Sequence, residues 1–265
     1  MNRRHFLLAG VATSGSFFSF AHADSSIIHI NDAINKSGRQ RMLSQRLAKC
    51  YLQIGQEVDL VRSNKIFSIS LGLFERQLNE LQAFAPTAGS KTTLAELRTV
   101  WARYKNALTS NAPNRLDARA VMVMNEEVLV LAHAVTVQLE ELSGSAAAHL
   151  VNISGRQRML SQRMAKFYQA INWGVASSDA LINLARARDE FLRAMKELSD
   201  SPKNTAAIRQ EIVLAQQQWL FFDQALKSSA DSNESKLRFA SNVATTSERI
   251  LETMDRITGM YEQLA

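Results

Sequence analysis

The stretch GRQRMLSQRLAK, residues 38–49, returns almost unchanged as GRQRMLSQRMAK, residues 155–166. Eleven of the twelve positions are identical, and the exception exchanges Leu47 for Met164. The same shift of 117 positions pairs further residues on both sides of these stretches, Asn35 with Asn152 among them. Similarity at a fixed spacing indicates an internal duplication. The chain is therefore expected to contain two copies of one structural unit.

The composition predicts that this unit is helical. The chain of 265 residues is 46% apolar and has only 10 Gly and 3 Pro, which leaves few turn formers for β-hairpins. Turn-like clusters around Pro86, Pro113 and Pro202, and from Ser229 to Ser235, separate long stretches whose apolar residues are three and four apart. We expect four helices per copy. The predicted fold is all-α: two tandem antiparallel four-helix bundles, packed as a pseudo-two-fold dimer.

The N-terminus has the layout of an export signal. Arg3 and Arg4 precede a short apolar run that ends in AHA, as in a twin-arginine signal. We expect cleavage after Ala23 and a mature protein in the periplasm, and an uncleaved membrane anchor is the alternative. Glu126 and Glu127 interrupt the longest later apolar run, so the mature chain is expected to be soluble.

These signals divide the chain into three segments. Residues 1–23 form the signal peptide, residues 24–143 the first bundle and residues 146–265 the second. The boundary lies at the Ser-Gly-Ser cluster of residues 143–145, the one turn-like cluster between the copies.

Other functional classes find little support in the sequence. Loss of the signal would remove two of the 31 basic residues and none of the 25 acidic ones, and the remaining net charge of +4 is too small to indicate a nucleic-acid partner. Cys50 is the one cysteine, and the remaining histidines, His29, His133 and His149, lack the spacing of metal ligands. No phosphate-binding loop, nucleophile elbow or pair of catalytic carboxylates occurs. We therefore expect no catalytic residue, metal or cofactor.

A helical wheel gives the repeated stretch two buried sides. Leu43 and Leu47 fall on the side that suits the core of their own bundle. The opposite side carries small and polar residues with one arginine: Ser37, Gly38, Arg41, Ser44 and Gln45 in the first copy, and Ser154, Gly155, Arg158, Ser161 and Gln162 in the second. A glycine inside a helix lowers the stability of the helix by about 1 kcal/mol relative to alanine. Close approach of another helix would explain why this side of the helix has a glycine. Because four antiparallel helices return the chain to its starting end, the two copies of this side can meet with their helices parallel.

Such a pairing would bring Arg41 and Arg158 together in a partly buried cleft. Two buried like charges repel each other, and a small anion that accepts hydrogen bonds from both guanidinium groups would compensate them. Donors near Gly38 and Gly155 would complete the site, which suits a planar monoanion with three oxygens. The supporting residues would be Ser37, Ser44, Gln45, Ser154, Ser161 and Gln162. The alternative is that the small residues serve helix packing alone.

The segments INKSGRQRMLSQRLAKCY, residues 34–51, and VNISGRQRMLSQRMAKFY, residues 151–168, resemble the signature helix of the NarX-like, or PilJ-type, sensor domain. This domain lies outside the membrane in nitrate-responsive histidine kinases and in type IV pilus chemotransducers. In the nitrate sensors, the ligand lies between the signature helices of two subunits and is held by the glycine and by the arginine three residues later. The resemblance thus implies two ligand-binding pairs, Gly38 with Arg41 and Gly155 with Arg158.

The predicted function is that of a sensor and not of an enzyme. It would bind nitrate, nitrite or a similar small inorganic anion. Members of the family usually carry one such domain ahead of a membrane helix and a signalling module, whereas this chain is expected to have two such domains and neither of the others, so it would report the anion to a membrane sensor kinase or chemotransducer. No nucleic-acid partner is expected, and oligomerisation is left open. The alternative is a ligand-free helical adaptor that docks on a membrane sensor or a pilus chemosensory component through an exposed signature helix.

Overall fold

The computed structural model describes residues 26–27, 29–228 and 232–264, and this part of the chain contains eight helices and no strand. The helices are α1 (Ile30–Gly55), α2 (Leu60–Phe84), α3 (Ala88–Thr109), α4 (Arg115–Ser143), α5 (Ala146–Trp173), α6 (Ala180–Asp200), α7 (Ala206–Leu226) and α8 (Asn233–Glu262). The all-α prediction is confirmed. The expected signal peptide and its cleavage after Ala23 lie outside the described residues.

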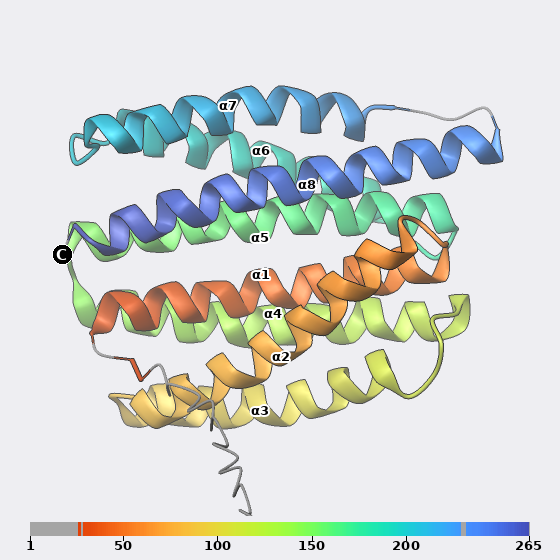
Figure 1. The fold of residues 1–265 in the computed structure, drawn as a ribbon. Helices are drawn as coiled ribbons and strands as arrows, with labels where there is room; N and C mark the ends of the chain where they lie inside the picture. The colour runs from red at the N-terminus through yellow and green to blue at the C-terminus, as the bar shows by residue number, and fades with distance from the viewer. Residues whose placement is uncertain (1–25, 28, 229–231, 265) are drawn as a thin grey trace, which may run out of the picture.

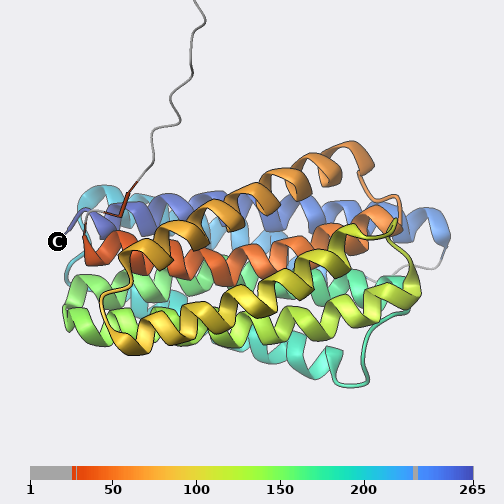
Figure 2. The same ribbon diagram turned by 90° about the horizontal axis from the view of Figure 1, so that it is seen from below.

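The helices α1 and α5 form the centre of the molecule. Figures 1 and 2 show them side by side, with α2, α3 and α4 on the side of α1 and with α6, α7 and α8 on the side of α5. Accordingly, α1 packs against α2 and α4, and α5 packs against α6 and α8. Each signature helix therefore has its own bundle on one side and the other signature helix on the opposite side.

The two central helices run parallel. Toward the middle of the contact, Arg158 of α5 donates a hydrogen bond to Asn35 of α1. At the C-terminal ends of the two helices, Gln56 donates to the carbonyl oxygen of Gln169. The repeated segments thus lie in contact along α1 and α5, in the orientation expected from four helices per copy.

The predicted turns separate the helices. Pro86 lies between α2 and α3, Pro113 between α3 and α4, and Pro202 between α6 and α7. The link between α4 and α5 consists of Gly144, which is left-handed with a φ of 59°, and Ser145, whose side chain caps the start of α5. The division into two domains stays a prediction.

One turn was not located from the sequence. Between α1 and α2 the backbone is left-handed at Glu57 and Asp59, with φ values of 59° and 45°, although neither residue is glycine. The equivalent turn after α5 uses Gly174, with a φ of 72°. A left-handed backbone favours glycine, so only the second copy signals this turn.

The duplication extends to the aromatic cores. Phe74 and Trp101 stack with ring centroids 3.8 Å apart, and Phe191 and Trp219 stack at 4.5 Å. The interplanar angle is 17° in both pairs. A shift of 117 positions aligns Phe74 with Phe191, and one extra residue in the second copy makes the shift 118 for Trp101 and Trp219, so both copies build the same core.

The helix α4 is the one helix in the described part of the chain that is long and apolar enough to span a membrane. Its best window has a mean hydropathy of 1.5, and one third of that window is buried. Glu126 and Glu127 interrupt it, and α4 packs against α1 and α3 as a helix of the bundle.

Candidate functional site

The predicted arginine pair lies in the middle of the contact between α1 and α5. Arg41 and Arg158 are both fully buried, with 0% of their surface exposed. A β-carbon built on Gly38 would lie 3.2 Å from Nη2 of Arg41 and 3.6 Å from Nη2 of Arg158. On Gly155, the corresponding distances are 3.7 and 3.1 Å. The structure thus brings together all four residues that are expected to hold an anion, and the glycines leave room for both guanidinium groups.

Each arginine reaches across to the other half of the chain. Nη2 of Arg41 donates to the side-chain oxygen of Asn152 at 2.7 Å and to its carbonyl oxygen at 3.3 Å. Nη2 of Arg158 donates to the same two atoms of Asn35 at 2.8 and 3.2 Å. The contacts are equivalent because the shift of 117 residues relates both the arginines and the asparagines.

The asparagines connect the arginines to two glutamates. The amide of Asn152 donates to Glu140 of α4, and the amide of Asn35 donates to Glu262 of α8. An amide that donates to a carboxylate becomes a better acceptor at its own oxygen, because hydrogen bonds in a chain polarise one another. Each buried guanidinium group is therefore stabilised indirectly by a carboxylate one residue away.

Both arginines keep one unpartnered donor. Nε of Arg41 and Nε of Arg158 are buried without a hydrogen-bond partner in the described residues. Burial, together with the charges of Arg156 and Arg158, lowers the pKa of Arg41 to about 9. Burial also lowers the pKa of Arg158 to about 10, against the opposing charge of Asp255. Both groups stay charged at neutral pH, so two like charges share a site without water contact.

The two halves differ at the next contact. Nη1 of Arg158 donates to a carboxylate oxygen of Asp255 on α8. Nη1 of Arg41 instead contacts Nδ1 of His133 on α4, at 3.3 Å. Asp255 also pairs with Arg39, at 2.9 Å. Of the two buried arginines, only Arg158 therefore has a carboxylate in direct contact within the described residues.

The expected supporting residues do not contact the guanidinium groups. The serine hydroxyls donate to carbonyl oxygens of their own helices: Ser37 to Ile34, Ser44 to Arg41, Ser154 to Leu150 and Val151, and Ser161 to Arg158. Gln45 and Gln162 donate to the neighbouring serines, and Gln162 also contacts Lys49. In this arrangement the serines allow the helices to approach closely and bond within their own helices.

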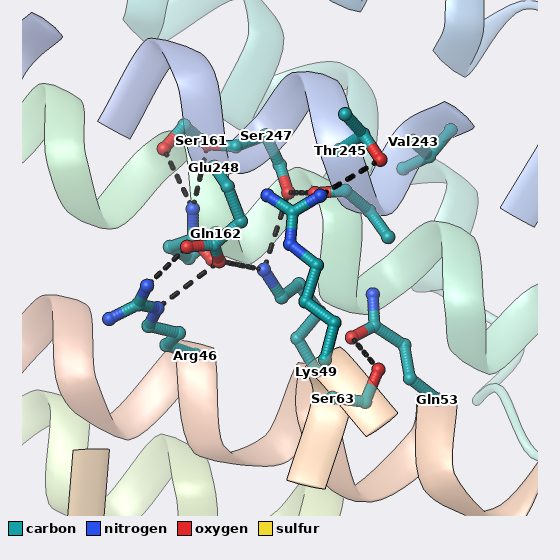
Figure 3. A network of polar contacts seen from close by, with 12 residues as sticks. Arg46, Lys49, Gln53, Ser63, Ser161, Gln162, Val243, Thr245, Ser247 and Glu248 are labelled. Carbon is teal, nitrogen blue, oxygen red and sulfur yellow. Dashed lines mark hydrogen bonds and ion pairs between the residues drawn. The ribbon is translucent and has the colours of Figure 1, made fainter. Parts of the chain in front are cut away.

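A buried ion cluster lies one to two turns further along α1, and the sequence did not reveal it (Figure 3). Lys49 points from α1 between α5 and α8, where it pairs with Glu248 and donates to Gln162 at 2.7 Å. Arg46 pairs with the same glutamate. Burial opposes ionisation of Glu248, but the charges of Lys49 and Arg46 lower its pKa to about 2.

The second half builds the equivalent cluster. Lys166 pairs with Glu126 at 2.6 Å and donates to Asn125 at 2.7 Å, and Arg163 pairs with Glu126 at 2.7 Å. Burial, only partly opposed by Glu126, lowers the pKa of Lys166 to about 8. Each cluster joins a signature helix of one half to the last helix of the other, so together they bind the two halves to each other.

These partners share one relation in the sequence. A shift of 122 residues relates Asn125 to Ser247, Glu126 to Glu248, His133 to Asp255 and Glu140 to Glu262. The repeated signature helices are related by 117 residues, so a search at that shift alone misses the pairs on α4 and α8. The adjacent residues Asn125-Glu126 resemble Ser247-Glu248, and this similarity is the feature of the sequence that indicates the shift of 122 residues.

Comparison with known proteins gives one family. The family model described as "Type IV pili methyl-accepting chemotaxis transducer N-term" matches residues 26–133 and, again, residues 142–246. The two matches divide where the duplication divides, and each includes one signature helix. No curated protein and no solved structure matches the chain.

Proposed function

Since this chain belongs to the PilJ family of type IV pili methyl-accepting chemotaxis transducer N-terminal domains, whose role is in sensing and signalling, we propose that it binds nitrate, nitrite or a similar small oxyanion between Arg41 and Arg158. The observation that carries this proposal is the pairing of two fully buried guanidinium groups against two glycines. It would act as a binding protein and not as an enzyme.

The chemistry of the site favours an anion. At an effective dielectric constant of about 20, two unit charges about 4 Å apart repel by about 4 kcal/mol, and the repulsion weakens as their separation grows. The protein groups that face Nη2 of Arg41 and of Arg158 are neutral amide and carbonyl oxygens. An oxyanion would replace these contacts to neutral oxygens with ion pairs, in which donor and acceptor are both charged. The third oxygen of nitrate would be able to accept from one of the two unpartnered Nε donors.

Binding would also alter the contact between the halves. Because Arg41 and Arg158 are fully buried, an anion can reach them only if Asn35 and Asn152 give way. The amides of these asparagines also bond Glu262 and Glu140, on the last helix of each half. Displacement of the asparagines would therefore loosen α1 from α8 and α5 from α4, and a partner could read that change.

The proposed partner and location are supported by the family and by the sequence of the N-terminus. A sensor unit of this family would report to a membrane sensor kinase or a chemotransducer, and the signal-like residues 1–23 support a periplasmic location. N-terminal sequencing of the exported protein tests the location. A mature chain that begins at Asp24 is the expected result, and a retained signal on a membrane-bound product would favour the anchored alternative.

A ligand-free adaptor is the second candidate, and the closed site favours it. Each guanidinium group already has protein partners, so the pair can also act as a clamp between the halves. The expected docking through an exposed signature helix is wrong, however, because both signature helices are buried against each other. An adaptor would have to use another surface.

Thermal unfolding separates the two candidates. If an anion binds only the folded protein, nitrate at 100 times its dissociation constant adds about 2.7 kcal/mol to the free energy of unfolding and raises the melting temperature. Nitrite should act similarly, and a bulky organic anion at the same ionic strength should not. A melting temperature unmoved by nitrate, nitrite and other small oxyanions would contradict the proposal and favour the adaptor.

A further inference from the structure

The difference between His133 and Asp255 concerns the charge that each half presents to the arginine pair. The two residues occupy equivalent positions on α4 and α8, and each contacts Nη1 of the arginine in its own half. We propose that the anion site is one-sided: the ligand's negative charge is held at Arg41, and His133 is the specificity-determining residue that keeps this position free of a protein carboxylate. This inference rests on the proposed function and deepens it.

The contact with Arg41 fits a neutral His133. A guanidinium group can only donate hydrogen bonds, so Nη1 of Arg41 must donate to Nδ1 of His133. Nδ1 is then unprotonated, and the ring is neutral with its proton on Nε2. In agreement with this, burial and the charges of Arg41 and Arg156 lower the pKa of His133 to about 4.

The neighbouring ion pairs also differ between the Arg158 side and the Arg41 side of the site. In the second half, Asp255 lies between Arg158 and Arg39, so one carboxylate serves the buried arginine and its neighbour across the interface. The residue equivalent to Arg39 is Arg156, and it pairs instead with Glu190 of α6. A carboxylate, that of Glu190 in the second half, therefore also lies near Arg41, but its direct contact is with the partly exposed Arg156.

Arg41 is thus the buried cation with a deficit of negative charge. Among the described residues, its guanidinium group has an amide oxygen, a carbonyl oxygen and an imidazole nitrogen as partners, and no carboxylate. One missing negative charge fits a monovalent oxyanion such as nitrate or nitrite. A divalent anion would bring a second charge toward Asp255, already paired with Arg158, so sulfate should bind more weakly.

Two substitutions of the same size separate charge from shape. His133→Asp copies the arrangement of the second half, and His133→Asn places a neutral group of equal size at the same position. The measurement is the apparent dissociation constant for nitrate, from the nitrate-dependent rise in melting temperature of the full chain. We expect His133→Asp to weaken nitrate binding at least tenfold and His133→Asn to stay within about threefold of the wild type. Sulfate at the same ionic strength should give a smaller shift than nitrate in the wild type.

The empty proteins provide a second readout. Without added anion, His133→Asp should melt at a higher temperature than His133→Asn, because its carboxylate can pair with Arg41. If the wild type responds to nitrate and His133→Asp responds equally, the one-sided site is refuted while the proposed function stands. An equal loss of nitrate binding in both variants would also refute it, because shape and not charge would then matter. If nitrate has no effect on the wild type but His133→Asp is the more stable variant, the proposed function fails while the charge deficit at Arg41 is supported.

Discussion

The guanidinium group of Arg41 lies beside that of Arg158, and each donates to the asparagine six positions before the other arginine. Two buried cations are thus linked by neutral asparagines in the centre of the contact between the halves, and only Arg158 also has a carboxylate in direct contact. Such an arrangement is costly unless a further negative charge or a strong clamp offsets it. The proposed anion site and the predictions below follow from this relationship.

Substitution of Gly155 by alanine should impair anion binding without unfolding the protein. The new β-carbon would lie 3.1 Å from Nη2 of Arg158, so the flexible end of that side chain must move. The gain in helix propensity, about 1 kcal/mol, offsets the crowding, so the free energy of unfolding should change by less than about 1 kcal/mol. Nitrate binding should weaken at least tenfold. The control is Gly72→Ala in α2, where nothing lies within 4 Å: it should stabilise the protein and leave nitrate binding unchanged. Equal nitrate binding in both variants would contradict the role of the glycines.

The two ion clusters should differ in their contribution to stability. Lys49→Met leaves the nearly buried carboxylate of Glu248, with 3% of its side chain exposed and with Arg46 as its remaining charged partner, and should cost about 3 kcal/mol in urea unfolding. Lys166→Met leaves Glu126, which is 40% exposed and partly solvated, and should cost about half as much or less. Equal losses in the free energy of unfolding would show that burial of the glutamate does not determine the effect of removing its lysine partner.

The stability of the empty protein should depend on pH through His133. Burial and the charges of Arg41 and Arg156 hold its pKa at about 4 in the folded protein, against 6.5 as the ordinary value, while Glu140 and Glu190 act in the opposite direction. The unfolded chain then binds more protons between these values, so this contribution is present above pH 6.5 and is lost as the pH falls through about 4. Relative to His133→Asn, the wild type should lose on the order of 2 kcal/mol between pH 6.5 and pH 4. Parallel pH profiles of the two proteins would contradict the prediction.

Much of the fold could be predicted because the duplication presents each sequence pattern twice. The repeated glycine and arginine on one side of a helix predicted a close parallel contact, and the structure has α1 and α5 in that contact. The turn at Glu57 and Asp59 could not be predicted, because its left-handed residues are not glycine and tertiary contacts impose the conformation.

The site was only partly predictable for a different reason. Gly38, Arg41 and their equivalents belong to the repeated stretch and can be found from it. Their partners lie about 90 to 100 residues away on α4 and α8, where a shift of 122 residues, and not of 117, relates the two halves. The sequence alone gave no reason to place His133 beside Arg41 or Asp255 beside Arg158. The sequence also gave no reason to bury Lys49, which is buried because Glu248 of the other half provides its partner.

Titration calorimetry measures nitrate binding directly and tests whether Arg41 and Arg158 form one anion site. We expect one nitrate per chain for the wild type, because two arginines from the two halves share one ligand. Arg41→Ala and Arg158→Ala should each weaken binding, Arg41→Ala the more strongly, since Asp255 already compensates Arg158. Each variant could be as stable as the wild type without ligand, because each relieves the repulsion between the two cations. Wild-type affinity in both arginine variants, or two equal sites per chain, would contradict the account.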